Sequence, residues 1–227
     1  MKRLWIVGAG AFGREVLAWL RDVPAAQRTW EIAGFLDLNA AALKGYPCDL
    51  SIAGEESSFS LSDYDVFICA LGDPEKKLRA CRLLKSRGAV FTTLIHPTAI
   101  VGPYCSVGEG TILCPGSIVT TNVTLGNFVT VNMNSTVGHD VIIGDGSTLS
   151  CHCDVTGRAR LGEGVFMGTH AAVLPGVVVG DYAKVGAGSV AIQNVRPHTT
   201  VMGVPAREVF SSGREGHKDA RSNAPIH

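Results

Sequence analysis

Charge is scarce in this chain of 227 residues, and it is balanced. Lys and Arg together number 20, as do Asp and Glu, and charged residues make up 18% of the sequence. Proteins that bind nucleic acids or anionic membrane surfaces by electrostatics carry a basic excess, which this sequence lacks. It also has no uninterrupted run of about 18 apolar residues, the length that a membrane-spanning helix needs. We therefore expect neither a nucleic-acid partner nor a membrane span.

Paired cysteines are lacking as well. The seven cysteines are odd in number and show no paired spacing, so the sequence does not predict a disulfide framework. We expect reduced thiols inside a cytoplasmic protein. The opening segment does not predict a secretory signal either, because Arg14 and Glu15 interrupt its apolar run and no cleavage site follows.

The middle of the chain has an apolar residue at every sixth position, without a slip in phase. A glycine often follows at once, and a compact residue follows four places later. This period matches neither the 3.6 residues of a helix nor the 2 residues of a strand. It predicts a hexapeptide β-solenoid. The apolar series is Val101, Val107, Leu113, Val119, Leu125, Val131, Val137, Ile143, Leu149, Val155, Leu161, Met167, Val173, Val179, Val185 and Ala191.

Each repeat of such a solenoid supplies one short strand and one corner. Three repeats make a triangular coil, and successive coils stack at the inter-strand spacing of about 4.8 Å. The aliphatic residue fills the interior, the compact residue turns inward beside it, and the glycine is expected to adopt backbone angles that other residues avoid. One coil buries little alone, so the stack is stable only as a whole. The low charge fits a solenoid whose sides are covered by other subunits.

Residues 1–95 predict a small Rossmann-like α/β domain. An apolar strand over residues 3–7 leads into a glycine-rich turn, which opens an amphipathic helix over residues 14–20. Such a turn lets the backbone approach a phosphate at the N-terminus of a helix. Further strands are predicted over residues 30–36, 66–71 and 89–94, with a charged helix that ends near residue 87.

Ligands of such sheets bind beyond the carboxyl ends of the strands, which predicts a nucleotide site there. Glycines that serve only tight packing are the alternative. A dehydrogenase is disfavoured, because the second half of a dinucleotide fold is absent. The candidate substrate-binding residues are Gly8, Gly10, Gly13, Asp37, Gly72 and Asp73.

His96-Pro97 marks the domain boundary, and the solenoid domain is predicted over residues 96–210. After Ala191 the six-residue phase is lost. The segments around Arg196-Pro197 and Gly203–Arg207 suggest a return segment along the prism. Residues 211–227 are polar, small and charged, which predicts a disordered tail.

The best catalytic candidate is His139 with Asp140 beside it. His139 lies two places after an inward aliphatic residue, so it is expected on a corner and pointing outward. Asp140 can hold one ring nitrogen and leave the other free to accept a proton. A surface or interface histidine without a chemical role is the alternative.

The whole chain resembles the bacterial nucleotide-sugar acetyltransferases that modify 4-amino-4,6-dideoxysugars, and it is similar to the sialic acid O-acetyltransferases. Both groups join a Rossmann-like domain to a β-helix, and they imply a left-handed one here. The matching residues are Gly8-Ala9-Gly10, Gly13, Gly34-Phe35-Leu36-Asp37, Gly72-Asp73, His96-Pro97-Thr98-Ala99, Asn132, His139-Asp140 and Gly203-Val204-Pro205-Ala206.

The resemblance implies that the N-terminal domain holds a nucleotide sugar, while acetyl-CoA runs along the solenoid between two subunits of a homotrimer. It also implies a histidine base, which falls on His139, and an acidic partner, which falls on Asp140; some members have glutamate there. The residues implied for acetyl-CoA are Asn132 and Gly157, with Gly157 placed as a backbone donor to the oxyanion. Arg207, near the end of the expected return segment, is a further candidate, for the 3′-phosphate of CoA; a surface role is the alternative.

The predicted activity is acetyl-CoA-dependent acetylation of the 4-amino group of a nucleotide-linked 4-amino-4,6-dideoxysugar, by direct attack and without a metal. A thioester is already activated, so neither Cys114 nor Cys151 is needed as a nucleophile. The alternatives are a sugar O-acetyltransferase, a non-catalytic nucleotide-sugar-binding scaffold, and a zinc-dependent carbonic anhydrase. For the last, His152 and His170 are expected to stack on one edge of the solenoid, but His139 lies on another edge.

Overall fold

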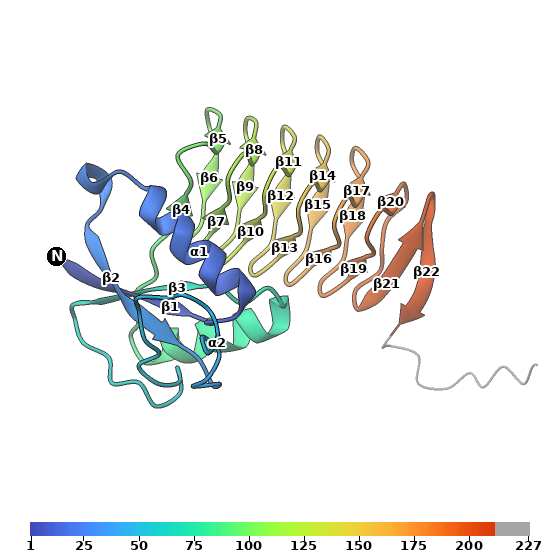
Figure 1. The fold of residues 1–227 in the computed structure, drawn as a ribbon. Coiled ribbons are helices and arrows are strands. Elements are labelled where there is room, and N and C mark those ends of the chain that lie inside the picture. Colours follow the sequence, from blue (N-terminus) through green and yellow to red (C-terminus); the bar gives the residue numbers. More distant parts are fainter. Residues whose placement is uncertain (212–227) are drawn as a thin grey trace, which may run out of the picture.

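A computed structural model describes residues 1–211 of the chain, which form a small α/β domain and a long β-solenoid (Figure 1). Except for Ser211, which ends the last strand, the predicted tail lies outside the described residues. In the N-terminal domain, β1 (Lys2–Val7), β2 (Trp30–Leu36) and β3 (Asp65–Cys69) form a parallel sheet in the order β2-β1-β3. The helices are α1 (Ala11–Asp22), the 3-10 turn η1 (Ala25–Gln27) and α2 (Pro74–Ser86).

The prediction of a strand over residues 89–94 is wrong. Phe91 makes only a single parallel bridge with Phe67, and Leu94–Ile95 form β4, which is already the first rung of the solenoid. The chain leaves the small sheet at this point because it enters the first coil.

The solenoid consists of three parallel sheets, and each strand pairs with the strand one coil further on. The first sheet contains β4, β7 (Ile112–Leu113), β10 (Thr130–Val131), β13 (Thr148–Leu149), β16 (Phe166–Met167) and β19 (Lys184–Val185). The second contains β5 (Ile100–Val101), β8 (Ile118–Val119), β11 (Thr136–Val137), β14 (Asp154–Val155), β17 (Ala172–Val173) and β20 (Val190–Ala191). The third contains β6 (Ser106–Val107), β9 (Thr124–Leu125), β12 (Ile142–Ile143), β15 (Arg160–Leu161) and β18 (Val178–Val179). The predicted Rossmann-like domain with a left-handed parallel β-helix is confirmed.

The interior of the prism is filled as the period predicts. From Leu113 onward the aliphatic series is buried, and Val119, Val137 and Val155 have no exposed surface. Hydroxyls of the compact series link successive coils: Ser135 Oγ donates to the carbonyl of Ser150 at 2.8 Å and accepts from the N–H of Cys153 at 3.0 Å. Ser147 makes the same pair of bonds, to the carbonyl of Gly162 and from the N–H of Val165, whereas the buried Ser117 Oγ has no partner.

The prediction that the glycines after the aliphatic residues adopt backbone angles that other residues avoid is wrong. Gly102 and Gly138 do not adopt a positive φ; the left-handed residues come two places later, as at Tyr104 (61°) and Asp140 (60°). A Cβ on Gly102 would lie 1.6 Å from the carbonyl oxygen of Thr120 in the next coil. These glycines are needed because two coils approach closely.

The predicted return segment is also wrong. β21 (Thr199–Gly203) pairs in parallel with β19, and β22 (Ala206–Ser211) folds back against it as an antiparallel hairpin. The chain turns around in Val204-Pro205, whose peptide bond is cis. The hairpin thus closes the end of the solenoid instead of running along it.

Helix α2 attaches the N-terminal domain to the first solenoid sheet and to one adjacent corner (Figure 1). Lys77 is fully buried there, and its Nζ donates to the hydroxyls of Thr130 at 3.0 Å and Thr148 at 2.8 Å. Leu78 fills the space above Gly146, where a Cβ would lie 2.3 Å from the Leu78 side chain. The two domains therefore share one packed interface. No helix among residues 1–211 has both the length and the apolar character to cross a bilayer.

Burial of Lys77 makes the stability of this interface depend on pH. Loss of hydration lowers the pKa of the Lys77 ammonium from 10.5 to about 8, because only neutral hydroxyl and carbonyl groups accept its hydrogen bonds. The unfolded chain then binds more protons than the folded one between these two pH values, so stability rises with pH across that window. We expect the unfolding free energy of the wild type, relative to Lys77→Met, to rise by about 2 kcal/mol from about pH 7.5 to about pH 10. Urea denaturation of both proteins at the two pH values measures this difference, and an unchanged or falling difference would contradict it.

Candidate active site

His139 and Asp140 occupy the corner between β11 and β12. His139 Nδ1 lies 2.7 Å from Asp140 Oδ2, and about half of each side chain is exposed. Aspartate tolerates the left-handed conformation that this corner requires, so the sequence His-Asp can place both side chains together. The carboxylate acts as the acceptor for a proton on Nδ1, which leaves the lone pair of Nε2 free to accept another.

The corner is held by the coils on both sides. The carbonyl of His139 accepts from the N–H of Arg158 at 2.8 Å, and the N–H of Asp140 donates to the carbonyl of Thr121 at 3.2 Å. The imidazole lies across Gly157 in the next coil: a Cβ there would be 2.4 Å from His139 Nε2. Gly157 thus leaves room for the ring and brings backbone close to the reactive nitrogen.

The predicted substrate-binding residues gather in the N-terminal domain, at the carboxyl ends of its strands. The turn after β1 is tight, since a Cβ on Gly13 would lie 2.0 Å from the carbonyl oxygen of Gly8. Asp37 Oδ2 accepts from the N–H of Ala9 at 2.7 Å, so this carboxylate braces the turn. Asp73 caps α2 by accepting from the N–H of Lys76 at 2.9 Å, with Gly72 exposed just before it.

A small pocket of about 90 Å³ opens at this edge of the sheet. Gly8 and Asp37 line it, as do Lys76 and Arg79 of α2. A Cβ on Gly10 would meet no atom within 4 Å, so the tip of the turn faces open space. Glu56 and Asp37 add two carboxylates to the lining, while Lys76, Arg79 and the backbone of the turn supply the groups suited to an anionic ligand.

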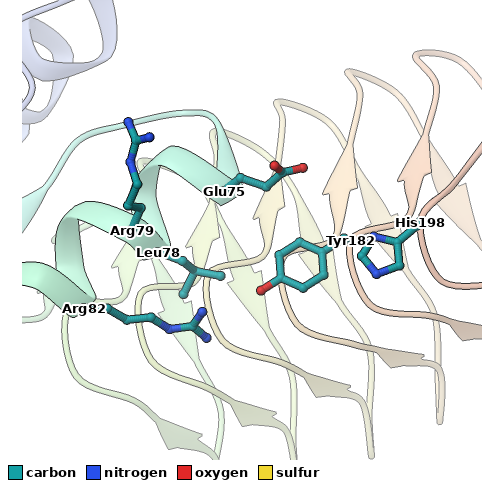
Figure 2. Close-up of a pocket in the computed structure, with 6 residues that line it drawn as sticks. All are labelled: Glu75, Leu78, Arg79, Arg82, Tyr182 and His198. Carbon is teal, nitrogen blue, oxygen red and sulfur yellow. The ribbon is translucent and has the colours of Figure 1, made fainter. Parts of the chain in front are cut away.

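A larger cleft of about 490 Å³ lies between α2 and the solenoid (Figure 2). Leu78, Arg82, Tyr182 and His198 line it together with Glu75 and Arg79, and Arg79 also lines the small pocket. Sequence reasoning missed these residues. The two arginines lie on the predicted charged helix, but nothing in the sequence indicates that this helix faces the corners that carry Tyr182 and His198.

Asn132 and Arg207, both expected to bind acetyl-CoA, do not lie beside the His139 of the same chain. Asn132 occupies the corner between β10 and β11, where its Oδ1 accepts from the N–H of Met133 at 2.8 Å. Arg207 is an exposed residue of β22, at the far end of the solenoid. The corner of His139 is on the side of the prism away from the N-terminal domain (Figure 1). A single chain thus separates its histidine corner from its nucleotide pocket.

His152 and His170 stack as expected, with ring centroids 4.8 Å apart. Within residues 1–211, no three His, Cys, Asp or Glu side chains are arranged to hold a metal ion. All seven cysteines are free thiols. Burial raises the pKa of Cys114 well above its ordinary value, which disfavours a thiolate nucleophile there.

Comparisons with known proteins agree with this architecture. Residues 3–84 match the family model of the PglD N-terminal domain. The acetyltransferase domain of PglB from Neisseria gonorrhoeae shares the fold, with a TM-score of 0.83, 24% identity, and coverage of 92% of this chain and 100% of that one. PerB from Caulobacter crescentus, solved with CoA and GDP-perosamine, has a TM-score of 0.79 at 26% identity over 92% of this chain and 97% of that one.

Curated relatives match a shorter region. A serine acetyltransferase of Bacillus pumilus is 30% identical over 139 residues, which cover 61% of this chain. The chain spans 58% of the length of that relative. Residues 3–84 therefore match the PglD N-terminal domain, and the described chain shares its fold, an α/β domain joined to a left-handed β-helix, with these acetyltransferase structures.

Proposed function

We propose that the protein transfers the acetyl group of acetyl-CoA to the 4-amino group of a nucleotide-linked 4-amino-4,6-dideoxysugar. One observation carries the proposal: the His139–Asp140 pair lies against Gly157 on the solenoid of a chain that also has a phosphate-suited pocket in a PglD N-terminal domain. The CoA and GDP-perosamine bound to PerB support both ligand classes. The cytoplasmic location expected from the sequence stays a prediction.

The chemistry needs one base and one oxyanion stabiliser. A sugar ammonium has no lone pair, so the sugar reacts as the free amine, after one proton has passed to water. His139 Nε2 accepts the second proton as the amine nitrogen attacks the thioester carbonyl. Asp140 stabilises the imidazolium that forms. The tetrahedral intermediate carries a negative oxygen, for which we assign the N–H of Gly157 as a donor. Its collapse breaks the carbon–sulfur bond, and the departing thiolate takes the proton from His139, which leaves an amide and CoA.

The assembly is proposed to be a homotrimer, with acetyl-CoA between two solenoids. The distance between corner and pocket within one chain supports this, because the nucleotide sugar of one subunit then meets the His139 of another. Low charge on the solenoid agrees with covered sides. Asn132 and Arg207 keep their proposed roles at acetyl-CoA, with the Arg207 guanidinium assigned to the 3′-phosphate. Light scattering at micromolar concentration measures the mass, and a monomer would contradict this assembly.

Thiol release tests the activity. Acetyl-CoA is supplied with uridine, guanosine and thymidine diphosphate-linked 4-amino-4,6-dideoxyhexoses, and free CoA is measured with a thiol reagent. We expect release that depends on both substrates with at least one of the three nucleotides. Binding of a nucleotide sugar without any release would favour a non-catalytic scaffold.

Gly10→Val should separate the two ligand sites. A Cβ added at the tip of the turn has no protein atom within 4 Å, so the fold should persist, but the valine side chain blocks the approach of a phosphate. We expect at least tenfold weaker binding of the nucleotide sugar and unchanged binding of CoA, both measured by calorimetry. Equal loss of both ligands, or of neither, would reject the turn as the phosphate site.

A further inference from the structure

The charged residues that line the large cleft differ in their partners. Arg82 already has a partner, because its Nη2 donates to Glu163 Oε2 at 2.6 Å. Glu163 also accepts from the Tyr182 hydroxyl. The Arg79 and Glu75 side chains make no hydrogen bond or ion pair within residues 1–211. Within the described residues, the cleft therefore offers a ligand the guanidinium of Arg79 and the carboxylate of Glu75.

Arg79 stands where the small pocket and the large cleft meet, since it lines both. The small pocket of about 90 Å³ cannot hold a nucleotide sugar by itself, because sites for small ligands measure about 300–1,000 Å³. A nucleotide bound at the carboxyl edge of the sheet has room to continue past Arg79, because the large cleft begins there. The part of the ligand that crosses this point is the diphosphate, and a guanidinium binds phosphate oxygens in pairs.

Glu75 lies four residues before Arg79 on α2, which is about 6 Å along the helix axis. Figure 2 shows the two side chains diverging: Glu75 extends toward Tyr182 and His198, whereas Arg79 points away from them. A hexose that links a diphosphate to an ammonium has its two charges on opposite sides of the ring. The separation of Arg79 and Glu75 along the cleft thus matches the separation of the diphosphate and the ammonium on such a sugar.

The wall opposite Glu75 is rigid. The Tyr182 ring stacks on His198 with centroids 5.3 Å apart, and Gly164 lies against the ring, since a Cβ there would be 2.6 Å from it. Both ring faces are therefore covered, and the ring does not turn to accommodate a ligand. The hexose meets a wall of fixed shape.

We propose that this cleft is the acceptor subsite, in which Arg79 binds the diphosphate and Glu75 binds the sugar ammonium. Glu75 then sets the preference for an amine over a hydroxyl acceptor. This inference rests on the proposed function, and it goes further because it names the groups that choose the acceptor.

Arg79→Ala tests the diphosphate contact. Lys85→Ala is the matched control, because Lys85 is a cation of the same helix that pairs with Glu109 and lines neither pocket. The probes are the uridine, guanosine and thymidine diphosphate-linked 4-amino-4,6-dideoxyhexoses, titrated in a calorimeter. We expect binding about 10- to 100-fold weaker in Arg79→Ala and changed less than about twofold in Lys85→Ala. Equal effects of the two variants, or no effect of Arg79→Ala, would overturn the assignment.

Glu75→Gln tests the ammonium contact through selectivity. Glu75 also faces the positive end of the α2 dipole, but loss of that interaction affects every ligand alike. We expect affinity for the 4-amino sugar to fall about threefold to tenfold while affinity for the analogue with a 4-hydroxyl stays within about twofold. A parallel change for both sugars would overturn the role of Glu75. Thiol release by the wild type reports separately on the proposed function, because selective binding without release would reject catalysis and leave the subsite standing.

Discussion

His139→Ala should lower kcat for thiol release by about 100- to 10,000-fold, the usual contribution of a general base. The corresponding increase in the barrier is about 3–5 kcal/mol. The substitution removes the only imidazole at the β11–β12 corner and leaves Asp140 without its partner. Because the His139 side chain is half exposed and points away from the prism, folding should be unaffected.

Two further variants distinguish proton transfer by His139 from a purely structural role of its ring. His139→Asn keeps a polar side chain but offers no comparable base, so it should be nearly as damaged. Asp140→Asn should be milder, because it changes only the orientation and basicity of the ring. Activity of His139→Ala should recover partly at high pH, where the amine loses its proton unaided. A His139→Ala variant that keeps more than about a third of wild-type turnover, with its melting point unchanged, would place the base elsewhere.

Gly157→Ala should lower kcat by about 100-fold without unfolding the protein. The three atoms nearest to the added Cβ all belong to the His139 ring, and the closest is Nε2 at 2.4 Å. The ring must therefore move, and a displacement of about 1 Å in a reacting group costs on the order of 100-fold in rate. Steady-state kinetics of thiol release give kcat, and a thermal melting curve shows whether the variant is still folded.

The double variant His139→Ala/Gly157→Ala is the control for this effect. Without the imidazole, the added methyl has room, so Gly157→Ala should cause little further loss. Coupling of this kind is expected for two residues in contact that act as one unit. If the two losses multiply instead, Gly157 acts independently of the His139 ring.

The sequence predicts this fold well wherever a local pattern controls the backbone. The six-residue apolar series corresponds to the rungs, from β5 at Ile100–Val101 to β20 at Val190–Ala191, and β2 spans the predicted residues 30–36. The corner position of His139 follows from the same phase. Local patterns do not explain a residue whose identity depends on contacts between coils. Gly102 is an example, because a Cβ there would collide with a carbonyl oxygen of the next coil.

Contacts between the two domains were beyond local patterns. Lys77 looks like a solvated residue of a charged helix, yet it is buried against Thr130 and Thr148. The cleft between Arg79 and Tyr182 arises because α2 docks on the solenoid, and no period in the chain encodes that docking. The candidate base was therefore predictable, whereas the candidate acceptor subsite required the structure.

Product analysis tests acetyl transfer to a sugar amine most directly. Acetyl-CoA labelled with carbon-13 in the acetyl group is incubated with the protein and the panel of 4-amino-4,6-dideoxyhexose nucleotides, and the products are identified by tandem mass spectrometry. We expect one labelled acetyl group on the sugar nitrogen of a nucleotide sugar, formed by the wild type and nearly absent with His139→Ala. No labelled product with any member of the panel, or a label on a sugar hydroxyl, would contradict the proposed activity.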